Sequence, residues 1–245
     1  MNELNFENKT VLVVGGSSGI GNGIAQAFRR KGASVHVWGT RARASDYGDS
    51  EDSRLEGLHY AQVDVSQMKS IEQWKAPFEH LDVLVLSQGM VLYEKGEYKI
   101  DGFRHVIDVN LNSLMACADK FHPMLKASAG SLIVISSTAA FHSTRGNPAY
   151  NASKAGAVGL TRTLGDAWAP DGIRVNGIAP GMVATKMTKA TTDHPHRLEA
   201  MLQNIPMRRL GTIDEMSGVA LFLASPLATY ILGQTIPVDG GLVLR

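Results

Sequence analysis

Residues 11–21 read VLVVGGSSGIG, and this stretch decides how the chain folds. An apolar, β-branched run leads into a glycine-rich turn, and apolar residues at helical spacing follow the turn. In such a turn Gly15 permits the tight bend, Gly19 lets the backbone approach a pyrophosphate, and Gly21 lets helix and strand pack closely. Exposed backbone N–H groups and the helix dipole then favour an anion. The stretch therefore predicts a dinucleotide-binding turn, in preference to an ordinary strand–helix connection.

Short apolar runs alternate with longer helical patterns along the rest of the chain. Repeated strand–helix–strand order predicts an α/β fold with an open, doubly wound parallel sheet and helices on both faces. No internal repeat, low-complexity tract or linker divides the sequence, so we expect one Rossmann-type domain over residues 1–245. The expected strands are 11–14, 34–38, 58–63, 82–86, 131–135, 173–178 and 234–238, and the expected helices are 19–31, 66–77, 101–127, 148–168 and 213–223.

Two stretches interrupt this alternation. Residues 41–55 are polar and charged, and we expect a surface loop after the second strand. Residues 182–206 contain several Met and Thr side chains around Asp193-His194-Pro195-His196. An insertion late in the chain, beyond a strand's carboxyl end, is typical of a mobile substrate lid. The two histidines lack a further His or Cys cluster, so a solvated loop is favoured and no metal is expected.

The bulk composition is that of an ordinary globular protein, with 44% hydrophobic and 19% charged residues. The formal net charge of +1 gives no electrostatic case for nucleic acid or a membrane surface as a partner. No apolar run approaches the ~20 residues of a membrane helix, and residues 1–10 lack the pattern of a signal peptide. Cys117 is the single cysteine, which excludes an intramolecular disulfide and fits a reducing compartment. We therefore expect a soluble, cytoplasmic protein.

A serine, a tyrosine and a lysine follow the fifth expected strand. Ser137 stands just beyond it, and Tyr150 and Lys154 are four residues apart, which places both on one face of a helix. A tyrosine with its usual pKa of ~10 carries protons poorly at neutral pH, but a nearby ammonium and an oxidised nicotinamide lower that pKa. Tyr150 can then exchange a proton with a carbonyl or alcohol oxygen that Ser137 orients. Tyr-x-x-x-Lys alone is often plain helix surface, and the serine and the glycine-rich turn are what favour a catalytic site.

These motifs are accompanied by Asp64-Val65 after the third strand, Pro180-Gly181 after the sixth, and Val238-Asp239-Gly240-Gly241 near the end. Together they resemble the short-chain dehydrogenase/reductase family over nearly the whole chain, and in particular its 3-oxoacyl-reductase-like branch. The resemblance implies hydride transfer between a nicotinamide cofactor and a carbonyl or secondary alcohol carbon. It also implies a homotetramer that packs through the C-terminal segment.

The resemblance further assigns site residues. Ser137, Tyr150 and Lys154 match the family's catalytic residues, and Asn110 matches a fourth that holds a helix kink and a relay water. Asp64-Val65 matches the pair that meets the adenine ring, and Thr185 a hydroxyl that contacts the carboxamide or a phosphate. The expected cofactor-binding residues are Gly15, Ser17, Ser18, Gly19, Ile20, Gly21, Thr40, Arg41, Asp64, Val65, Gly89, Tyr150, Lys154, Pro180, Gly181, Val183 and Thr185.

Two positions depart from the family pattern. Val14 precedes the first cofactor glycine where relatives usually have Thr, and Leu86-Ser87-Gln88-Gly89 stands where they usually have Asn-Asn-Ala-Gly. Gly89 still lets the chain pass close to a cofactor. The hydrogen bonds that the Thr and Asn side chains make in relatives must be replaced or absent, which affects local support of the site.

The choice of cofactor depends on the end of the second strand. Trp38 is followed by Gly39-Thr40-Arg41-Ala42-Arg43, which contains no acidic residue. An Asp there would bind the ribose hydroxyls and repel a 2′-phosphate, whereas Arg suits a phosphate. The pattern favours NADP(H) over NAD(H), chiefly through the missing acid. Two arginines that merely solvate a surface loop are the alternative.

Candidate substrate contacts follow the fourth strand and occupy the lid, because ligands bind at the carboxyl edge of such a sheet. They suggest a mainly apolar, adaptable pocket for a small carbonyl or alcohol, with an arginine that can meet an anion. Core packing of the methionines and a surface role for the arginine are the alternatives. The candidates are Gln88, Met90, Arg145, Met182 and Met187.

Two other functions compete with the oxidoreductase. The same fold can serve an epimerase or dehydratase that retains its cofactor, or a non-catalytic nucleotide-sensing scaffold. The altered Leu86-Ser87-Gln88 segment is the scaffold's only support. The intact Ser137, Tyr150 and Lys154 argue against it, since a scaffold does not need their spacing.

Overall fold

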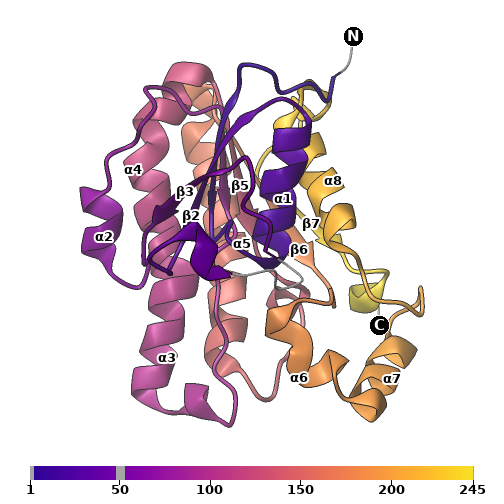
Figure 1. The fold of residues 1–245 in the computed structure, drawn as a ribbon. Coiled ribbons are helices and arrows are strands. Elements are labelled where there is room, and N and C mark those ends of the chain that lie inside the picture. The colour runs from indigo at the N-terminus through magenta and orange to yellow at the C-terminus, as the bar shows by residue number, and fades with distance from the viewer. Residues whose placement is uncertain (1–2, 48–52, 245) are drawn as a thin grey trace.

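The computed structural model describes residues 3–47 and 53–244. Within them, seven strands form one parallel sheet in the order β3-β2-β1-β4-β5-β6-β7, with helices on both faces (Figure 1). The predicted doubly wound α/β fold is confirmed. The strands are β1 (Thr10–Val14), β2 (Ser34–Gly39), β3 (His59–Gln62), β4 (Val83–Leu86), β5 (Ser131–Ile135), β6 (Arg174–Pro180) and β7 (Thr235–Val238).

The helices form two layers. α1 and α8 pack on one face of the sheet, and α4 and α5 pack on the other, with α2 beside α4 (Figure 1). Among the described residues, no helix is both long enough and apolar enough to cross a membrane. The helices are α1 (Gly19–Arg30), α2 (Met68–Gln73), α3 (Ile100–Ile107), α4 (Ser113–Ser128), α5 (Pro148–Trp168), α6 (Lys189–Thr192), α7 (Pro195–Asn204) and α8 (Ile213–Ala224).

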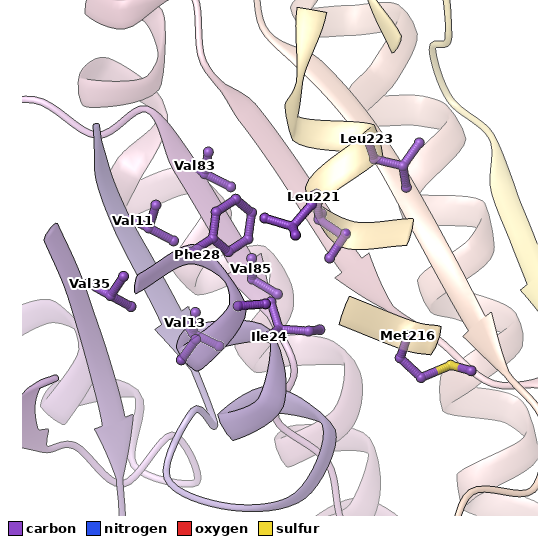
Figure 2. Close-up of a cluster of buried hydrophobic side chains, with 14 of the residues drawn as sticks. Val11, Val13, Ile24, Phe28, Val35, Val83, Val85, Met216, Leu221 and Leu223 are labelled. Atoms are coloured by element: carbon purple, nitrogen blue, oxygen red, sulfur yellow. The ribbon is translucent and has the colours of Figure 1, made fainter. Parts of the chain in front are cut away.

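The central strands are apolar throughout because both of their faces are covered. Successive side chains in a strand point to opposite sides of the sheet. Val11 and Val13 pack in the cluster that includes Phe28 of α1 (Figure 2). Leu12 and Val14 pack in the second cluster, under α4 and α5. A continuous apolar run is the pattern expected of a strand in a parallel sheet.

The strand order reverses at β1, which pairs with β2 on one side and with β4 on the other. In an open parallel sheet such a reversal leaves a crevice outside the carboxyl ends of the strands. The turn between β1 and α1 lies at this crevice, and so do the ends of β4 and β5.

The helix expected at 101–127 is two helices joined by a π-helical turn, η3 (Asp108–Asn112). Asn110 lies in this turn and is fully buried. Its Nδ2 donates to the carbonyl oxygen of Met90 and to the hydroxyl oxygen of Ser153. The kink that the family resemblance implies at Asn110 is therefore present, and the side chain ties it to the loop after β4 and to α5.

The helix expected at 66–77 is shorter and covers only Met68–Gln73. Trp74 takes an extended backbone, and its ring packs against that of Trp38 with 4.9 Å between centroids. Continuing the helix would bring Pro77 into its interior, where proline removes a hydrogen bond. Burying the indole against Trp38 ends the helix earlier.

The described parts of the two interrupting stretches contain short helices. Within 41–55, residues Ala44–Tyr47 form a 3-10 helix, η1, and residues 48–52 lie outside the described part. Residues 182–206, called here the lid segment, contain a 3-10 helix, η6 (Lys186–Thr188), followed by α6 and α7. α6 and α7 lie together at the end of the molecule that also carries α3 (Figure 1).

Candidate active site

A cavity of about 560 Å³ lies at the carboxyl edge of the sheet, at the reversal of strand order. We call it the switch-point cavity. Every expected cofactor-binding residue except Arg41 lines it, and so do Ser137, Gln88, Met90 and Met187. The residues from the sequence prediction that do not line it are Arg41, Asn110, Arg145 and Met182.

The glycine-rich turn forms one wall of the cavity. Gly15 and Gly19 both have positive φ, at 74° and 56°, which side-chain-bearing residues rarely adopt. A Cβ on Gly15 would lie 2.8 Å from the backbone nitrogen of Gln88. Ser18 is the N-cap of α1, but its side chain makes no capping hydrogen bond. The first N–H groups of the helix are therefore not capped by Ser18 and can bind an anion in the cavity. This wall fits a pyrophosphate.

Two buried polar atoms of lining residues have no hydrogen-bond partner within the described residues, Trp38 Nε1 and Gln88 Oε1. The Ser113 hydroxyl donates to the carbonyl oxygen of Val109 at 2.6 Å and accepts from Gln88 Nε2 at 3.0 Å. This arrangement fixes the orientation of the Gln88 amide and leaves its oxygen as the free acceptor. An orphaned donor and an orphaned acceptor beside one cavity fit a polar ligand such as a dinucleotide.

A side chain at Gly39, the last residue of β2, would be crowded. A Cβ on Gly39 would lie 2.3 Å from the Tyr47 hydroxyl oxygen and 2.7 Å from Ser17 Cβ. That hydroxyl also accepts hydrogen bonds from the backbone N–H groups of Thr40 and Arg41, at 3.0 and 3.2 Å. The Arg41 guanidinium lies 4.5 Å from the Tyr47 ring centroid and donates to the carbonyl oxygen of Asp46. It is therefore beside the cavity rather than in its wall.

Ser137, Tyr150 and Lys154 meet at the opposite wall. Ser137 follows β5, and its hydroxyl oxygen accepts from the backbone N–H of Ala139 at 3.1 Å, which leaves its proton free to donate. Tyr150 and Lys154 lie one turn apart on α5, with Lys154 Nζ 5.6 Å from the Tyr150 ring centroid. Nζ donates to the carbonyl oxygen of Ile135 at 2.9 Å. The spacing in sequence thus produces the expected cluster in space.

The sequence predicts that Lys154 and a bound, oxidised nicotinamide together lower the pKa of Tyr150. The protein groups by themselves raise it, chiefly through burial of the phenol. The Ser137 hydroxyl lowers that pKa, whereas Tyr93 and Glu97 raise it. Burial also lowers the pKa of Lys154 to about 8, because a buried ammonium is poorly solvated.

The remaining candidates lie around this cluster. Asn110 is behind the cavity wall, where its Oδ1 accepts from the backbone N–H of Met90 at 2.8 Å. Arg145 is exposed, and its carbonyl oxygen accepts from the Tyr98 hydroxyl at 2.6 Å. The carbonyl oxygen of Met182 accepts from the backbone N–H of Gly211 at 3.0 Å. The structure therefore brings Met90 and Met187, but neither Arg145 nor Met182, to the cavity.

Several lining residues are absent from the sequence prediction. Ser66 directly follows the predicted pair Asp64-Val65, and Lys186 and Thr188 lie inside the predicted lid. All three could have been predicted from these neighbours. Trp38 reads as a core residue, and nothing in the sequence marked His105 of α3 or Val109 of η3. The lining residues that were missed include Trp38, Ser66, His105, Val109, Lys186 and Thr188.

Two further features bear on reactivity. Cys117 is buried, and burial raises the pKa of its thiol to about 12, which fits the inert core cysteine that its apolar surroundings predict. Across residues 3–47 and 53–244, no group of three or more His, Cys, Asp or Glu side chains is placed to hold a metal ion.

Comparisons with known proteins agree with this geometry. Residues 14–243 match a family model described as enoyl-(acyl carrier protein) reductase. A 3-oxoacyl-[acyl-carrier-protein] reductase FabG of Chlamydia muridarum is 36% identical over 99% of this chain and all of its own length. The 2-dehydro-3-deoxy-D-gluconate 5-dehydrogenase of Bacillus subtilis is 37% identical over 98% of this chain and 96% of its own.

A solved structure shows the same fold. The RhlG/NADP active-site complex of Pseudomonas aeruginosa superposes with a TM-score of 0.87 at 30% identity and covers 99% of each chain. The relatives match along essentially the whole chain, and the same chain carries the glycine cradle and the Ser–Tyr–Lys cluster in one cavity. The protein therefore belongs to the short-chain dehydrogenase/reductase family, whose members are NAD(P)-dependent oxidoreductases that transfer hydride between nicotinamide and a carbonyl or alcohol carbon.

Proposed function

We propose that this protein is an NADP(H)-dependent reductase of a small carbonyl compound, acting through Ser137, Tyr150 and Lys154. The observation that carries the proposal is that this cluster and the glycine cradle line one cavity. The turn after β1 would hold the pyrophosphate of a dinucleotide, and the ends of β5 and α5 line the same cavity. The nicotinamide end of the dinucleotide would then lie beside the Tyr150 phenol.

Bound NADPH would supply the hydride to the carbonyl carbon. Ser137 donates a hydrogen bond to the carbonyl oxygen and holds it in place, because its own oxygen is already engaged by Ala139 N–H. Tyr150 donates the proton that the oxygen needs as negative charge develops there. A tyrosine with its usual pKa of ~10 is already protonated at neutral pH, and burial raises the pKa of Tyr150 further, so the phenol carries the proton that it donates. In the reverse direction the phenolate accepts the proton of an alcohol.

Lys154 and Asn110 support the proton transfer without donating the proton themselves. The Lys154 ammonium is held by the carbonyl oxygen of Ile135 and lies beside the phenol, where it stabilises the phenolate left after proton transfer. It can also bind the ribose hydroxyls of the cofactor. Asn110 holds Met90 and Ser153, so it fixes the loop after β4 against α5.

Three observations support NADP(H) over NAD(H). Gly39 ends β2 without a side chain and no acidic residue follows it before Arg43, so the carboxylate that would repel a 2′-phosphate is absent. Thr40 lines the cavity, and Arg41 stands next to it with an exposed guanidinium that can turn toward a phosphate. The similar RhlG structure was obtained with NADP.

The substrate class follows from the same cavity. Met90 and Met187 give its substrate side an apolar, adaptable lining. The named relatives act on a 3-oxoacyl group and on a keto-sugar acid, so both classes are candidates. We favour a small carbonyl compound that carries an apolar group beside the reacting carbon.

The test is a carbonyl panel with purified protein. A 3-oxoacyl thioester, a keto-sugar acid and a simple aliphatic ketone are each incubated with NADPH, and loss of reduced nicotinamide is compared with alcohol formed by mass spectrometry. Stoichiometric NADPH loss and alcohol formation support the proposal. Product formed without net NADPH loss indicates an epimerase or dehydratase, and NADPH binding without turnover of any compound indicates a nucleotide-sensing scaffold.

We also propose that the lid segment covers the substrate side of the cavity and that the protein is a cytoplasmic homotetramer. The Tyr93 hydroxyl donates to the carbonyl oxygen of Met187 at 2.5 Å, which joins the lid to the loop after β4. Large apolar side chains stay exposed at Tyr230, Leu227 and Ile100, which supports burial between copies. Light scattering on the purified protein measures the oligomeric state directly.

A further inference from the structure

Glu97 is a buried carboxylate that the proposed mechanism does not use. It lies in η2 (Gly96–Tyr98), between β4 and α3, and is 1% exposed. Burying a carboxylate is costly unless hydrogen bonds compensate for the lost water. Two nearby residues that precede it, Glu94 and Lys95, both have positive φ, at 55° and 58°, so the loop that presents Glu97 is itself held in an unfavourable conformation.

Three N–H donors compensate for this burial. Glu97 Oε1 accepts from the backbone N–H of Leu92 at 3.0 Å and from Asn147 Nδ2 at 3.2 Å. Oε2 accepts from the backbone N–H of Tyr150 at 2.9 Å, across 53 residues of sequence. One side chain thus joins the loop after β4, the residue before α5 and the first turn of α5.

The bond to Tyr150 replaces a local helix cap. The first N–H groups of a helix have no partner within the helix, and a side chain at the N-cap usually satisfies one of them. Asn147 stands at the N-cap of α5, but its side chain makes no capping bond and donates instead to Glu97 and to the carbonyl oxygen of Leu92. Glu97 supplies the missing acceptor, and its negative charge is favourable at the positive end of the helix dipole.

We propose that Glu97 is a positioning residue for Tyr150: it fixes the first turn of α5 against the loop after β4 and thereby holds the phenol toward Ser137. This inference rests on the proposed function, in which Tyr150 transfers the proton.

The charge of Glu97 adds a second effect. Among residues 3–47 and 53–244, no Lys, Arg or His nitrogen lies within 4.0 Å of the Glu97 carboxylate. The titratable groups beside the phenol are Tyr93 from the loop after β4, Glu97 from η2 and Lys154 from α5. His105 of α3 and Lys186 of η6 line the same cavity. Glu97 raises the pKa of Tyr150, after the larger effects of burial and Tyr93 and against that of the Ser137 hydroxyl, and so makes the phenolate that accepts a proton in alcohol oxidation less favourable.

The test compares E97Q with E94Q. In E97Q the amide keeps the shape of the side chain but removes the charge. Its NH2 group must oppose either the Tyr150 N–H or the donors of Leu92 and Asn147, and the remaining oxygen is a weaker acceptor than a carboxylate oxygen. E94Q removes the same charge from an exposed position of the same loop, without a bond to α5. Both variants, the wild type and Y150F are assayed with NADPH and the best substrate of the carbonyl panel, in both reaction directions and across pH.

We expect E97Q to lower kcat about tenfold, because a small misplacement of a catalytic group is costly, while KM for NADPH stays within about twofold. The pH midpoint for alcohol oxidation should shift to lower pH in E97Q, since removing the carboxylate lowers the pKa of Tyr150. E94Q should match the wild type in kcat and in pH midpoint. Hydrogen exchange should accelerate in the first turn of α5 in E97Q alone.

The inference is overturned if E97Q matches E94Q in kcat and pH midpoint, even if E97Q melts at a lower temperature, because Glu97 would then be structural only. Y150F separates this failure from a failure of the proposed function. An inactive Y150F with an unaffected E97Q overturns the role of Glu97 alone. An active Y150F overturns the proposed function and the positioning role together.

Discussion

A Cβ placed on Gly21 would lie 2.3 Å from the carbonyl oxygen of Gly15, so α1 and the turn after β1 touch backbone to backbone. No side-chain rotation relieves that contact. We predict that G21A pushes the turn out of shape, destabilises the fold by about 1–3 kcal/mol and weakens NADPH binding. A Cβ on Gly218 in α8 would have nothing within 4 Å, so G218A should instead stabilise by about 0.5–1 kcal/mol. Thermal melts and a fluorescence titration with NADPH measure both effects, and a G21A protein that binds NADPH normally would refute the close-packed turn.

Arg41 is predicted to recognise the 2′-phosphate of NADP(H). Its guanidinium lies on the Tyr47 ring and is exposed, so it can reorient toward a phosphate at the end of β2. Hydrogen bonds to charged groups contribute about 1.5–3 kcal/mol, so R41A should weaken NADPH binding by about ten- to a hundredfold and leave NADH binding unchanged. R43A, two residues further along the same loop, is the control and should have a smaller effect. Equal losses for NADPH and NADH in R41A would remove the basis for NADP(H) selectivity.

Burial of the Lys154 ammonium is predicted to lower the free energy of unfolding at neutral pH. Burial lowers its folded-state pKa from 10.5 to about 8, so the folded protein holds this proton less tightly than the unfolded chain does. The cost is constant below about pH 8 and disappears as the pH rises above about 10.5, where both states are neutral. K154M should therefore be more stable than the wild type at about pH 7, by less than about 3 kcal/mol because the carbonyl of Ile135 loses its donor. Urea denaturation of both proteins at about pH 7 and above about pH 10.5 checks this. A gain in the free energy of unfolding that is equally large at the higher pH would show that burial of the charge is not its cause.

The contact between Tyr93 and Met187 is predicted to hold the lid segment. Y93F removes the donor to the carbonyl oxygen of Met187 and keeps the ring. One exposed hydrogen bond contributes about 0.5–1.5 kcal/mol, so residues 186–192 should exchange amide hydrogens about two- to tenfold faster in Y93F. KM for the carbonyl substrate should rise while NADPH affinity is kept. Y98F, which removes the comparable bond to the carbonyl oxygen of Arg145, is the control and should leave exchange in the lid unchanged.

The fold could be predicted because its determinants are local. The run VLVVGGSSGIG fixes a strand, a turn with two positive φ angles and a helix without reference to the rest of the chain. α5 is found at 148–168, as predicted, because Pro148 and the apolar spacing define it locally. Tyr150 and Lys154 meet Ser137 for the same reason, since four residues on a helix and the end of a neighbouring strand leave few other arrangements.

The remaining features depend on contacts between distant residues. The early end of α2 comes from Trp74 packing on Trp38, 36 residues earlier in the chain. The pKa of Tyr150 is raised chiefly by burial and further by Tyr93 and Glu97, none of which the spacing of Tyr150 and Lys154 reveals. Arg145 lies between Ser137 and Tyr150 in sequence but stays outside the cavity, because its loop is held by Tyr98. Spacing in the sequence correctly placed Tyr150 and Lys154 on one face of α5. It did not place the loop that carries Arg145.

Y150F tests the central claim most directly, because it removes one oxygen and keeps the ring beside Lys154. We expect kcat for NADPH-dependent carbonyl reduction to fall by about a hundred- to ten-thousandfold, the range that general acid catalysis contributes, while NADPH binds with unchanged affinity. A Y150F protein that reduces the same carbonyl at the wild-type rate would contradict the assignment of Tyr150 as the proton donor.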